Sequence, residues 1–438
     1  MHSPSIDSEI RRLAIPALGT LLAEPLLIAV DSAMVGHLGT HPLAGLSLAS
    51  TILTTVVGLC IFLAYATTAS TARLVGAGKT PAALRQGVDG VWLGFGLGVI
   101  LGILLFAFAH PLLRLFSPEP AVLDQAVHYL RASAFGLPGM LTVLAATGTL
   151  RGLGDTKPPF YVATLGAILN APANFVLIYV ADWGIAGAGA GTAFAQTFMG
   201  ATLALILIKK ARFHGVSLLP SGTGVLRSLR EALPLIVRTL SLRAAILLQI
   251  TAATSVGTIA LASNQITMTF WNFAAYGLDA LATAAQILVG QGLGSESKDR
   301  VRAVLSRCLN RGVVYGVWLG VALCALSWIL PTFISADPAV RTLATHTLWV
   351  TALALPIASV AYMLDGVLIG AGDTRRLAWY MVGALALFTP CALAIIWWGE
   401  GSAAQILLWV AYAAVFMSAR TFAMYRRVQK DAWMRLGS

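Results

Sequence analysis

The sequence predicts an all-α polytopic membrane protein of twelve transmembrane helices, arranged as two pseudo-symmetric six-helix bundles. Three observations lead to this fold class: the composition, the number of long apolar stretches, and an internal repeat. Of the 438 residues, 58% are hydrophobic and 11% are charged, whereas soluble domains carry about 25% charged residues. Such a chain cannot cover a water-facing surface, so we expect lipid to surround much of it.

Twelve apolar stretches are long enough to cross a bilayer. A hydrocarbon core about 30 Å thick needs roughly 20 apolar helical residues. The runs are continuous rather than alternating, which disfavours a β-barrel. They lie at residues 12–36, 43–75, 86–109, 122–150, 159–181, 185–209, 230–256, 258–290, 304–332, 340–368, 375–398 and 401–424.

Basic residues gather on one side of these predicted spans. Of the 29 Lys and Arg residues, 24 fall in segments that lie on the same side as the N-terminus. The positive-inside rule then places both termini in the cytoplasm, with the chain crossing the cytoplasmic membrane many times. The net charge of +11 is explained by this orientation and by contact with anionic lipid headgroups. Nucleic acid is not an expected partner.

The chain repeats itself at an offset of 218 residues. Residues 116–157 and 334–375 share 16 identities in 42 positions. The best-matched stretch aligns Leu150–Lys157 with Leu368–Arg375. Pro16 and Pro234 also correspond. Each repeat holds six spans, so both insert with the same orientation, as in transporters whose halves are related by an axis along the membrane normal.

This repeat divides the chain into two lobes. We expect an N-lobe at 1–209, a cytoplasmic linker at 210–228, a C-lobe at 229–424 and a basic cytoplasmic tail at 425–438. The linker assignment rests on a polar segment that contains Pro220 and the glycine-rich run Ser221–Gly224, both typical of a connection between structural units.

Carboxylates inside apolar stretches are the first candidate functional residues. A charged group at membrane depth costs roughly 2.5–3.5 kcal/mol on insertion scales. Asp31 has apolar neighbours on both sides, and burial disfavours its ionised form, so it could take up and release protons. It could also be a neutral or hydrogen-bonded residue that serves packing alone. Glu24 lies seven residues earlier, close to the same helix face. The two could share one proton or bind a cation, and Glu24 could equally be a polar residue without a coupling role.

Amides and prolines accompany these acids. Asn170 and Asn174 have i, i+4 spacing and therefore share a face. They could orient Asp31 or ligate an ion, or they could join helices by hydrogen bonds. Pro16 and Pro25 interrupt the first span, where proline can bend a helix, so ion uptake at Asp31 could couple to bending.

The second half carries a separate candidate substrate or ion site, formed by Asp279, Asp365, Arg243 and Gln249. Asp279 and Asp365 could pair with Arg243 or Arg238. A structural ion pair between spans and a substrate site are both compatible with this pattern, and a carboxylate left unpaired would attract cationic substrates.

Enzyme chemistry is not indicated. The segment Gly76–Thr80 lacks the first glycine and the preceding strand of a phosphate-binding loop. The seven histidines are scattered without metal spacing, and no nucleophile lies in a pattern with a base. We therefore expect no cofactor and no metal, apart from Na⁺ as an alternative near Asp31.

Four motifs resemble the multidrug and toxic compound extrusion (MATE) family, and in particular its DinF-like branch (DNA-damage-inducible protein F). They occur in the family's order and cover nearly the whole chain. The motifs are Leu13–Pro16 with Ala29–Gly39, Leu150–Lys157, Ala275–Ala280, and Leu364–Gly370.

The resemblance implies an antiporter that exports drugs and other small amphipathic or cationic organic compounds, driven by influx of H⁺ or Na⁺. Two lobes would alternate between inward-open and outward-open states. The family's first-helix aspartate corresponds to Asp31, its bending proline to Pro16, and its polar pair to Asn170 and Asn174. Asn174 stands where some members have Asp, which favours H⁺ over Na⁺.

Other functions remain as alternatives. A flippase for lipid-linked precursors shares the two-lobe plan, but it should have a strongly basic central cavity, and the acids in these spans argue against one. A membrane-embedded enzyme would need metal or catalytic motifs that the sequence lacks. The expected partners are small organic substrates and lipid, with the protein acting as a monomer.

Overall fold

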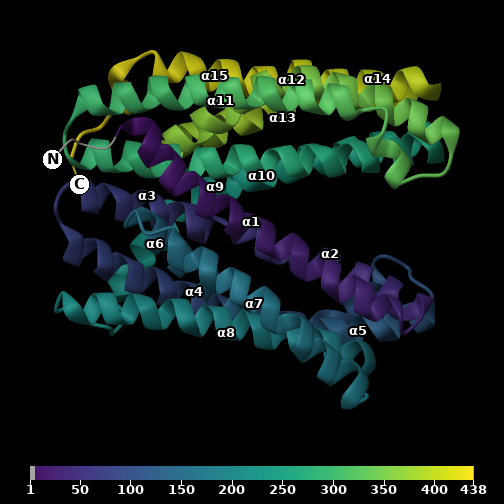
Figure 1. Ribbon diagram of the computed structural model, residues 1–438, viewed down its shortest axis with the longest axis horizontal. Helices are drawn as coiled ribbons and strands as arrows, with labels where there is room; N and C mark the ends of the chain where they lie inside the picture. Colours follow the sequence, from purple (N-terminus) through teal and green to yellow (C-terminus); the bar gives the residue numbers. More distant parts are fainter. Residues whose placement is uncertain (1–4, 438) are drawn as a thin grey trace. The chain divides into compact units, whose positions relative to one another are not determined.

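A computed structural model describes residues 5–437; the side chains of residues 223, 225–228, 230 and 231 lie outside this description. Within the described chain, all regular secondary structure is helical. Eleven helical segments are long and apolar enough to cross a membrane, and a bent pair of helices gives a twelfth. The predicted all-α class and the twelve spans are therefore confirmed (Figure 1).

The chain divides into two compact units, each described here by itself. The N-unit comprises Ile15–Leu233, and the C-unit comprises Met1–Ala14 together with Pro234–Ser438. The helices that start in or cross into the N-unit are α1 (Ile6–Gly36), α2 (Thr40–Leu59), α3 (Phe62–Gly76), α4 (Thr80–Arg114), α5 (Pro120–Ala134), α6 (Leu137–Gly152), α7 (Lys157–Phe175) with a following π-turn (Val176–Val180), and α8 (Gly184–Phe213).

The C-unit holds the remaining helices. They are α9 (Gly222–Val256), α10 (Thr258–Gly294), α11 (Lys298–Leu326) with a 3₁₀ turn (Leu330–Phe333), α12 (Pro338–Gly370), α13 (Thr374–Trp398), α14 (Gly401–Ala411) with a π-turn (Tyr412–Met417), α15 (Ser418–Val428) and a 3₁₀ turn (Asp431–Trp433). Helices α10 and α11 both pack against α12 (Figure 1).

Within each unit, glycines at positions that correspond in the repeat let neighbouring helices pack closely. In α4, Gly94 and Gly98 face the backbone of α6, where an added Cβ would collide with a carbonyl oxygen. Gly102 lies against α5 in the same way. At the repeat offset, α11 carries Gly312, Gly316 and Gly320 against α12. Close packing through three glycines spaced four residues apart therefore occurs once in each unit.

The bend between α5 and α6 measures 51°. Phe135 and Gly136 separate the two helices, and Pro138 stands in the first turn of α6, where its missing N–H is tolerated. Helix α1, by contrast, runs from Ile6 to Gly36 without interruption through Pro16 and Pro25. Bending of α1 at these prolines stays a prediction.

The connection from α8 to α9 covers residues 214–221, so it is shorter than the expected linker at 210–228. One face of α4 holds it. Arg85 Nη1 donates to the Ser217 carbonyl at 2.7 Å, and Trp92 Nε1 donates to the Leu218 carbonyl at 2.9 Å. The Ser221 N–H donates to Asp89 Oδ1 at 2.8 Å. The connection is therefore part of the N-unit.

The first turns of α1 belong to the C-unit and are joined to α11 by ion pairs. Asp7 accepts hydrogen bonds from Arg311 at 2.6 and 3.0 Å, and Glu9 accepts one from Arg300 at 3.1 Å. Helix α1 thus passes from the C-unit to the N-unit between Ala14 and Ile15. Helix α9 passes the opposite way, before Pro234.

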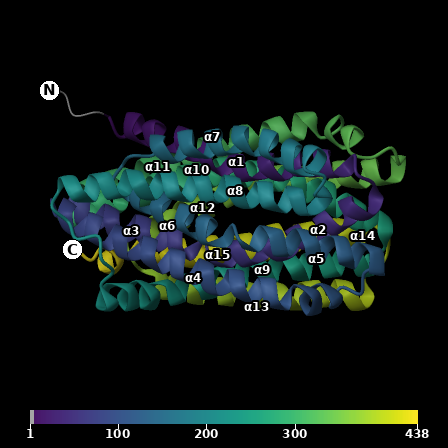
Figure 2. The ribbon, with the colours of Figure 1, turned by 90° about the horizontal axis from the view of Figure 1, so that it is seen from below.

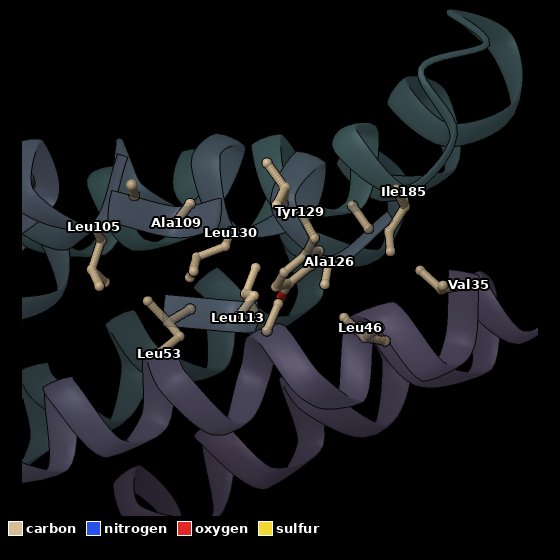
Figure 3. Packing of buried hydrophobic residues seen from close by; sticks show 14 of the residues in the cluster. Val35, Leu46, Leu53, Leu105, Ala109, Leu113, Ala126, Tyr129, Leu130 and Ile185 are labelled. Carbon is tan, nitrogen blue, oxygen red and sulfur yellow. The ribbon is translucent and has the colours of Figure 1, made fainter. Parts of the chain in front are cut away.

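A buried apolar cluster in the N-unit surrounds the side chain of Tyr129. Side chains of α2, α4, α5 and α8 interdigitate there, and Tyr129 lies among them with its hydroxyl oxygen inside the cluster (Figure 3). A second cluster joins α1 to α7 and α8. Helices α7 and α8 lie along each other, as Figure 2 shows from below. These contacts fix the four helices that supply the site's polar groups, α1, α5, α7 and α8.

Candidate functional site

Helix α1 contributes a buried carboxylate. Ala23, Leu27, Asp31 and Val35 form its buried stripe, at successive i, i+4 positions. Because this spacing drifts slowly around a helix, the stripe follows a ridge that packs against neighbouring helices. Asp31 is 3% exposed, so its charge depends on hydrogen bonds within the protein rather than on water.

Helix α7 supplies two amides to one oxygen of this carboxylate. Asn170 Nδ2 donates to Asp31 Oδ1 at 2.9 Å, and Asn174 Nδ2 donates to the same atom at 2.5 Å. Both side chains are completely buried. Their i, i+4 spacing puts them on one helix face, as the sequence indicated. Of the two uses considered, orientation of Asp31 is the contact that the structure contains.

Two hydroxyls hold the other oxygen. Thr192 Oγ1 of α8 donates to Asp31 Oδ2 at 2.7 Å, and the Tyr129 hydroxyl of α5 lies 3.5 Å from the same atom. Thr192 Oγ1 also lies 3.1 Å from the Ala188 carbonyl, one turn earlier in α8. A hydroxyl has one proton, so Thr192 can donate to Asp31 or to Ala188, but not to both.

Neutral groups alone therefore balance the Asp31 charge. Within the described part of the chain, no Lys, Arg or His side chain forms an ion pair with Asp31. The amide oxygens of Asn170 and Asn174 are buried there without a hydrogen-bond partner. The centre thus has a single negative charge, four donors and two spare oxygen ligands.

Gly191 makes room for this arrangement. A Cβ added at Gly191 of α8 would collide with Asn174 Oδ1. The glycine-rich start of α8, with Gly187, Gly189 and Gly191, also meets the backbone of the turn after α7 and of α5. Close approach of α7 and α8 is therefore what brings Asn174 and Thr192 to the same carboxylate.

Glu24 differs from Asp31 in burial. Its side chain is exposed, whereas Asp31, two turns later on the same helix, is buried. Glu24 takes part in an interaction of its own. Its sharing of a proton or a cation with Asp31 stays a prediction.

The C-unit pairs its candidate acid with arginine. Arg238 Nε donates to Asp365 Oδ1 at 3.0 Å, and Arg238 Nη2 donates to Asp365 Oδ2. Arg420 Nη2 lies 3.9 Å from Asp365 Oδ2, and its guanidinium stands 5.8 Å from the Tyr362 ring centre. All three charged side chains are buried. Of the pairings left open by the sequence, Asp365 takes Arg238. The second cation is Arg420, which lies within the stretch 401–424 and was not among the residues considered as partners.

The other C-unit candidates differ from one another in burial. Asp279 of α10 is half-buried and takes part in a further interaction. Arg243 of α9 is exposed. Gln249 is completely buried, and its Nε2 and Oε1 have no hydrogen-bond partner among the described residues. At the repeat offset, Gln249 is the counterpart of Asp31.

The C-unit therefore contains a neutral version of the Asp31 centre. The positions that correspond to Tyr129, Asn170 and Asn174 are Thr347, Phe388 and Ala392. An amide replaces the carboxylate, and apolar side chains replace its two amide donors. Among the described residues, no group of three or more His, Cys, Asp and Glu side chains could hold a metal ion.

The comparison with known proteins also divides the chain into two similar halves. The MatE family model matches the chain twice, at residues 16–176 and 234–393. Together these matches cover well over half of the chain, and their first residues, Pro16 and Pro234, are the repeat partners already noted.

The chain belongs to the MATE family. Protein DETOXIFICATION 43 of Arabidopsis thaliana is 33% identical over 67% of this chain, which spans 56% of the length of that relative. DNA damage-inducible protein F of Escherichia coli (strain K12) is 28% identical over 95% of this chain and 90% of its own length. The predicted DinF-like resemblance is confirmed.

Solved MATE structures share the fold. A crystal structure of a MATE protein in the bent conformation superposes with a TM-score of 0.90 at 19% identity, covering 98% of this chain and 96% of that one. Members of the MATE family are multidrug efflux transporters rather than enzymes. This chain is therefore a multi-pass membrane transporter.

Sequence reasoning on this MATE chain missed Tyr129 and Thr192 in the N-unit. Neither residue type is unusual in an apolar helix, so neither gives a local signal. The Gly187–Gly191 run was the available clue, because small residues permit close helix approach and thereby make a hydroxyl next to them a plausible contact for a buried acid on a neighbouring helix.

Proposed function

We propose that this MATE transporter is an antiporter that exports small amphipathic organic molecules while H⁺ enters through Asp31. It would act as a monomer in the cytoplasmic membrane with both termini in the cytoplasm, an orientation supported by the 24 of 29 basic residues on that side. The single observation that carries the proposal is a buried carboxylate held by four neutral donors, with no cation paired to it among the residues that the structure describes.

The hydrogen bonds supply a response to one proton. Ionised Asp31 accepts from Thr192 and the two amides, as observed. Protonated Asp31 becomes a donor, and Thr192 can receive that bond by turning its own proton to the Ala188 carbonyl 3.1 Å away. A proton would therefore reverse one bond between α1 and α8 and would remove the charge that the amides of α7 stabilise.

Helix α1 offers a route from this change to the rest of the protein. Its first turns belong to the C-unit, whereas Asp31 is held in the N-unit. The passage between units lies next to Pro16, where the helix lacks one backbone hydrogen bond. Altered hydrogen bonds at Asp31 would change how strongly the part of α1 after Pro16 is bound to the N-unit. This change is the proposed link between ion binding and alternating access by the two lobes.

Na⁺ is the alternative coupling ion, and one observation favours it. Rotating both asparagine amides would turn Asn170 Oδ1 and Asn174 Oδ1, now without partners, toward the Asp31 oxygens. Amide and carboxylate oxygens suit hard cations. One negative charge matches one monovalent ion, so the same centre could carry H⁺ or Na⁺.

The decisive experiment is efflux from proteoliposomes under separately imposed pH and Na⁺ gradients, with an amphipathic dye as the substrate. Wild-type protein should respond to the pH gradient, and Asp31→Asn should abolish that response. Asp182→Asn is the matched control: Asp182 is an exposed N-unit residue at a positive φ of 57° that asparagine tolerates. Full gradient-driven transport by Asp31→Asn would refute the role of Asp31. A response of the wild-type protein to the Na⁺ gradient alone would identify Na⁺ instead of H⁺ as the coupling ion.

A further inference from the structure

Helix α9 presents a charged side chain at mid-depth. Its membrane-spanning part is Ala232–Val256. Arg243 is eleven residues from one end and thirteen from the other, roughly 16 and 20 Å at the helical rise. The side chain is exposed, on the same face as Leu240 and Leu247, which are 48% and 64% exposed. The buried face, with Gln249, points away from it.

This position is unfavourable in lipid. A guanidinium at the centre of a bilayer costs roughly 2.5–3.5 kcal/mol on insertion scales, and more by other estimates. Arginine relieves such a cost by reaching the headgroups only from near a helix end, and Arg243 is near the middle. The exposed face of α9 at this depth therefore lines a water-accessible route rather than hydrocarbon.

The charge of Arg243 is also uncompensated. No ion pair to Arg243 occurs among the described residues, and no acid lies one turn away on α9. Asp365 is already shared by Arg238 and Arg420, and Asp279 is engaged in another interaction. A cation on a water-accessible route, with leucines one turn above and below, attracts an anion that carries an apolar part.

We propose that Arg243 binds the anionic group of the transported molecule, a carboxylate, sulfonate or phosphate on an amphipathic compound. The inference rests on the transport function proposed above and narrows its substrate class. The candidate acid Asp365, which could have attracted cationic compounds, is instead paired with arginine. Leu240 and Leu247 contact the apolar part. Lipid phosphates lie near the membrane surface, about 15 Å from mid-depth, so a soluble organic anion is the ligand.

Binding to the purified full-length protein tests this inference without requiring transport. The probes are 1-naphthalenesulfonate and 1-naphthylmethylammonium, which share a ring system and differ in charge, measured by equilibrium dialysis in a neutral detergent. Wild-type protein should bind the sulfonate at least tenfold more tightly. Arg243→Gln should weaken sulfonate binding by about 10- to 100-fold, as expected for a hydrogen bond to a charged group, and Arg243→Glu should invert the preference.

Controls separate the local effect from net charge and from lipid. Arg376→Gln removes an exposed charge in the first turn of α13 and should leave both affinities unchanged. Unaltered sulfonate binding in Arg243→Gln, or no sulfonate binding by the wild type, would overturn the inference. Displacement of the sulfonate by phosphatidylglycerol would also overturn it, by assigning the site to a headgroup. None of these results depends on the response of Asp31→Asn to a pH gradient, so failure here and failure of the antiport proposal are distinguishable.

Discussion

At the scale of single residues, the N-unit stabilises the buried charge of Asp31 with neutral hydrogen-bond donors instead of a counter-ion. Each hydrogen bond to a charged group contributes about 1.5–3 kcal/mol. The bonds from Asn170, Asn174 and Thr192, all 2.9 Å or shorter, can therefore support an ionised Asp31 without arginine. A charge held in this way can be neutralised by one proton, whereas Asp365, with Arg238 against it, cannot be neutralised without leaving arginine unpaired.

Replacing Thr192 should change the pH response of transport. Thr192→Val keeps the side-chain shape but removes a charged hydrogen bond to ionised Asp31 and a weaker neutral one from protonated Asp31, so the protonated carboxyl is favoured. The pH dependence of dye efflux should then move by about one unit toward alkaline pH, the difference between the two lost hydrogen bonds. Thr192→Ser retains the hydroxyl and should behave like the wild type. A profile for Thr192→Val that overlays the wild-type curve would contradict the role given to this bond.

At the scale of elements, the packing of α7 against α8 decides whether the site forms. The π-turn at Val176–Val180 begins two residues after Asn174, and the glycine-rich start of α8 passes beside it. Local helix propensity does not require either feature, because glycine inside a helix costs about 0.5–1 kcal/mol relative to alanine. The cost is offset by the close approach that brings two helices to one carboxylate.

Gly191→Ala should therefore impair transport although alanine is the better helix former. Its Cβ would displace Asn174 Oδ1 and with it the short hydrogen bond to Asp31. We expect a loss of gradient-driven efflux of at least tenfold, with the protein still folded by thermal unfolding in detergent. Gly96→Ala is the matched control, because a Cβ at Gly96 of α4 meets nothing within 4 Å. Equal efflux by both alanine variants would show that Asn174 tolerates the displacement.

Much of the fold could be predicted because membrane spans and repeats leave long-range marks in a sequence. The offset of 218 residues and the hydropathy gave twelve spans, and Asp31 with its asparagines stood out against apolar neighbours. The partners Tyr129, Thr192 and Arg420 could not be found in this way. Their roles depend on which helices touch at which depth, as the contrast between buried Asp31 and exposed Glu24 also shows.

At the scale of the whole molecule, each unit is completed by a helix that starts in the other. The opening turns of α1 are tied to α11 of the C-unit, and the start of α9 lies with the N-unit, where α4 holds the preceding connection. The two passages lie at Pro16 and Pro234, which correspond in the repeat. Two helices thus link the units at equivalent points, both next to a proline.

Releasing the start of α1 should slow transport more than it affects stability. Asp7→Asn with Glu9→Gln removes the ion pairs of both acids to α11. Solvent-screened pairs contribute little to stability, so thermal unfolding should change by only a few degrees. Turnover should fall severalfold with an unchanged pH profile, because Asp31 keeps its contacts while α1 is held less firmly. Asp299→Asn, which changes an exposed acid on α11, serves as the control. Wild-type turnover in the double variant would contradict the proposed link between the start of α1 and transport.

The amide at position 249 has a quantitative consequence. With a carboxyl at 31 and an amide at its counterpart, the proposed exchanger binds one coupling ion at this pair of positions. In the absence of an electrical potential, exchange of one ion for one solute molecule lets a tenfold ion ratio sustain at most about a tenfold solute ratio. Two equivalent acids would have allowed roughly a hundredfold, so this difference between the halves limits the concentration ratio of the exported compound across the membrane.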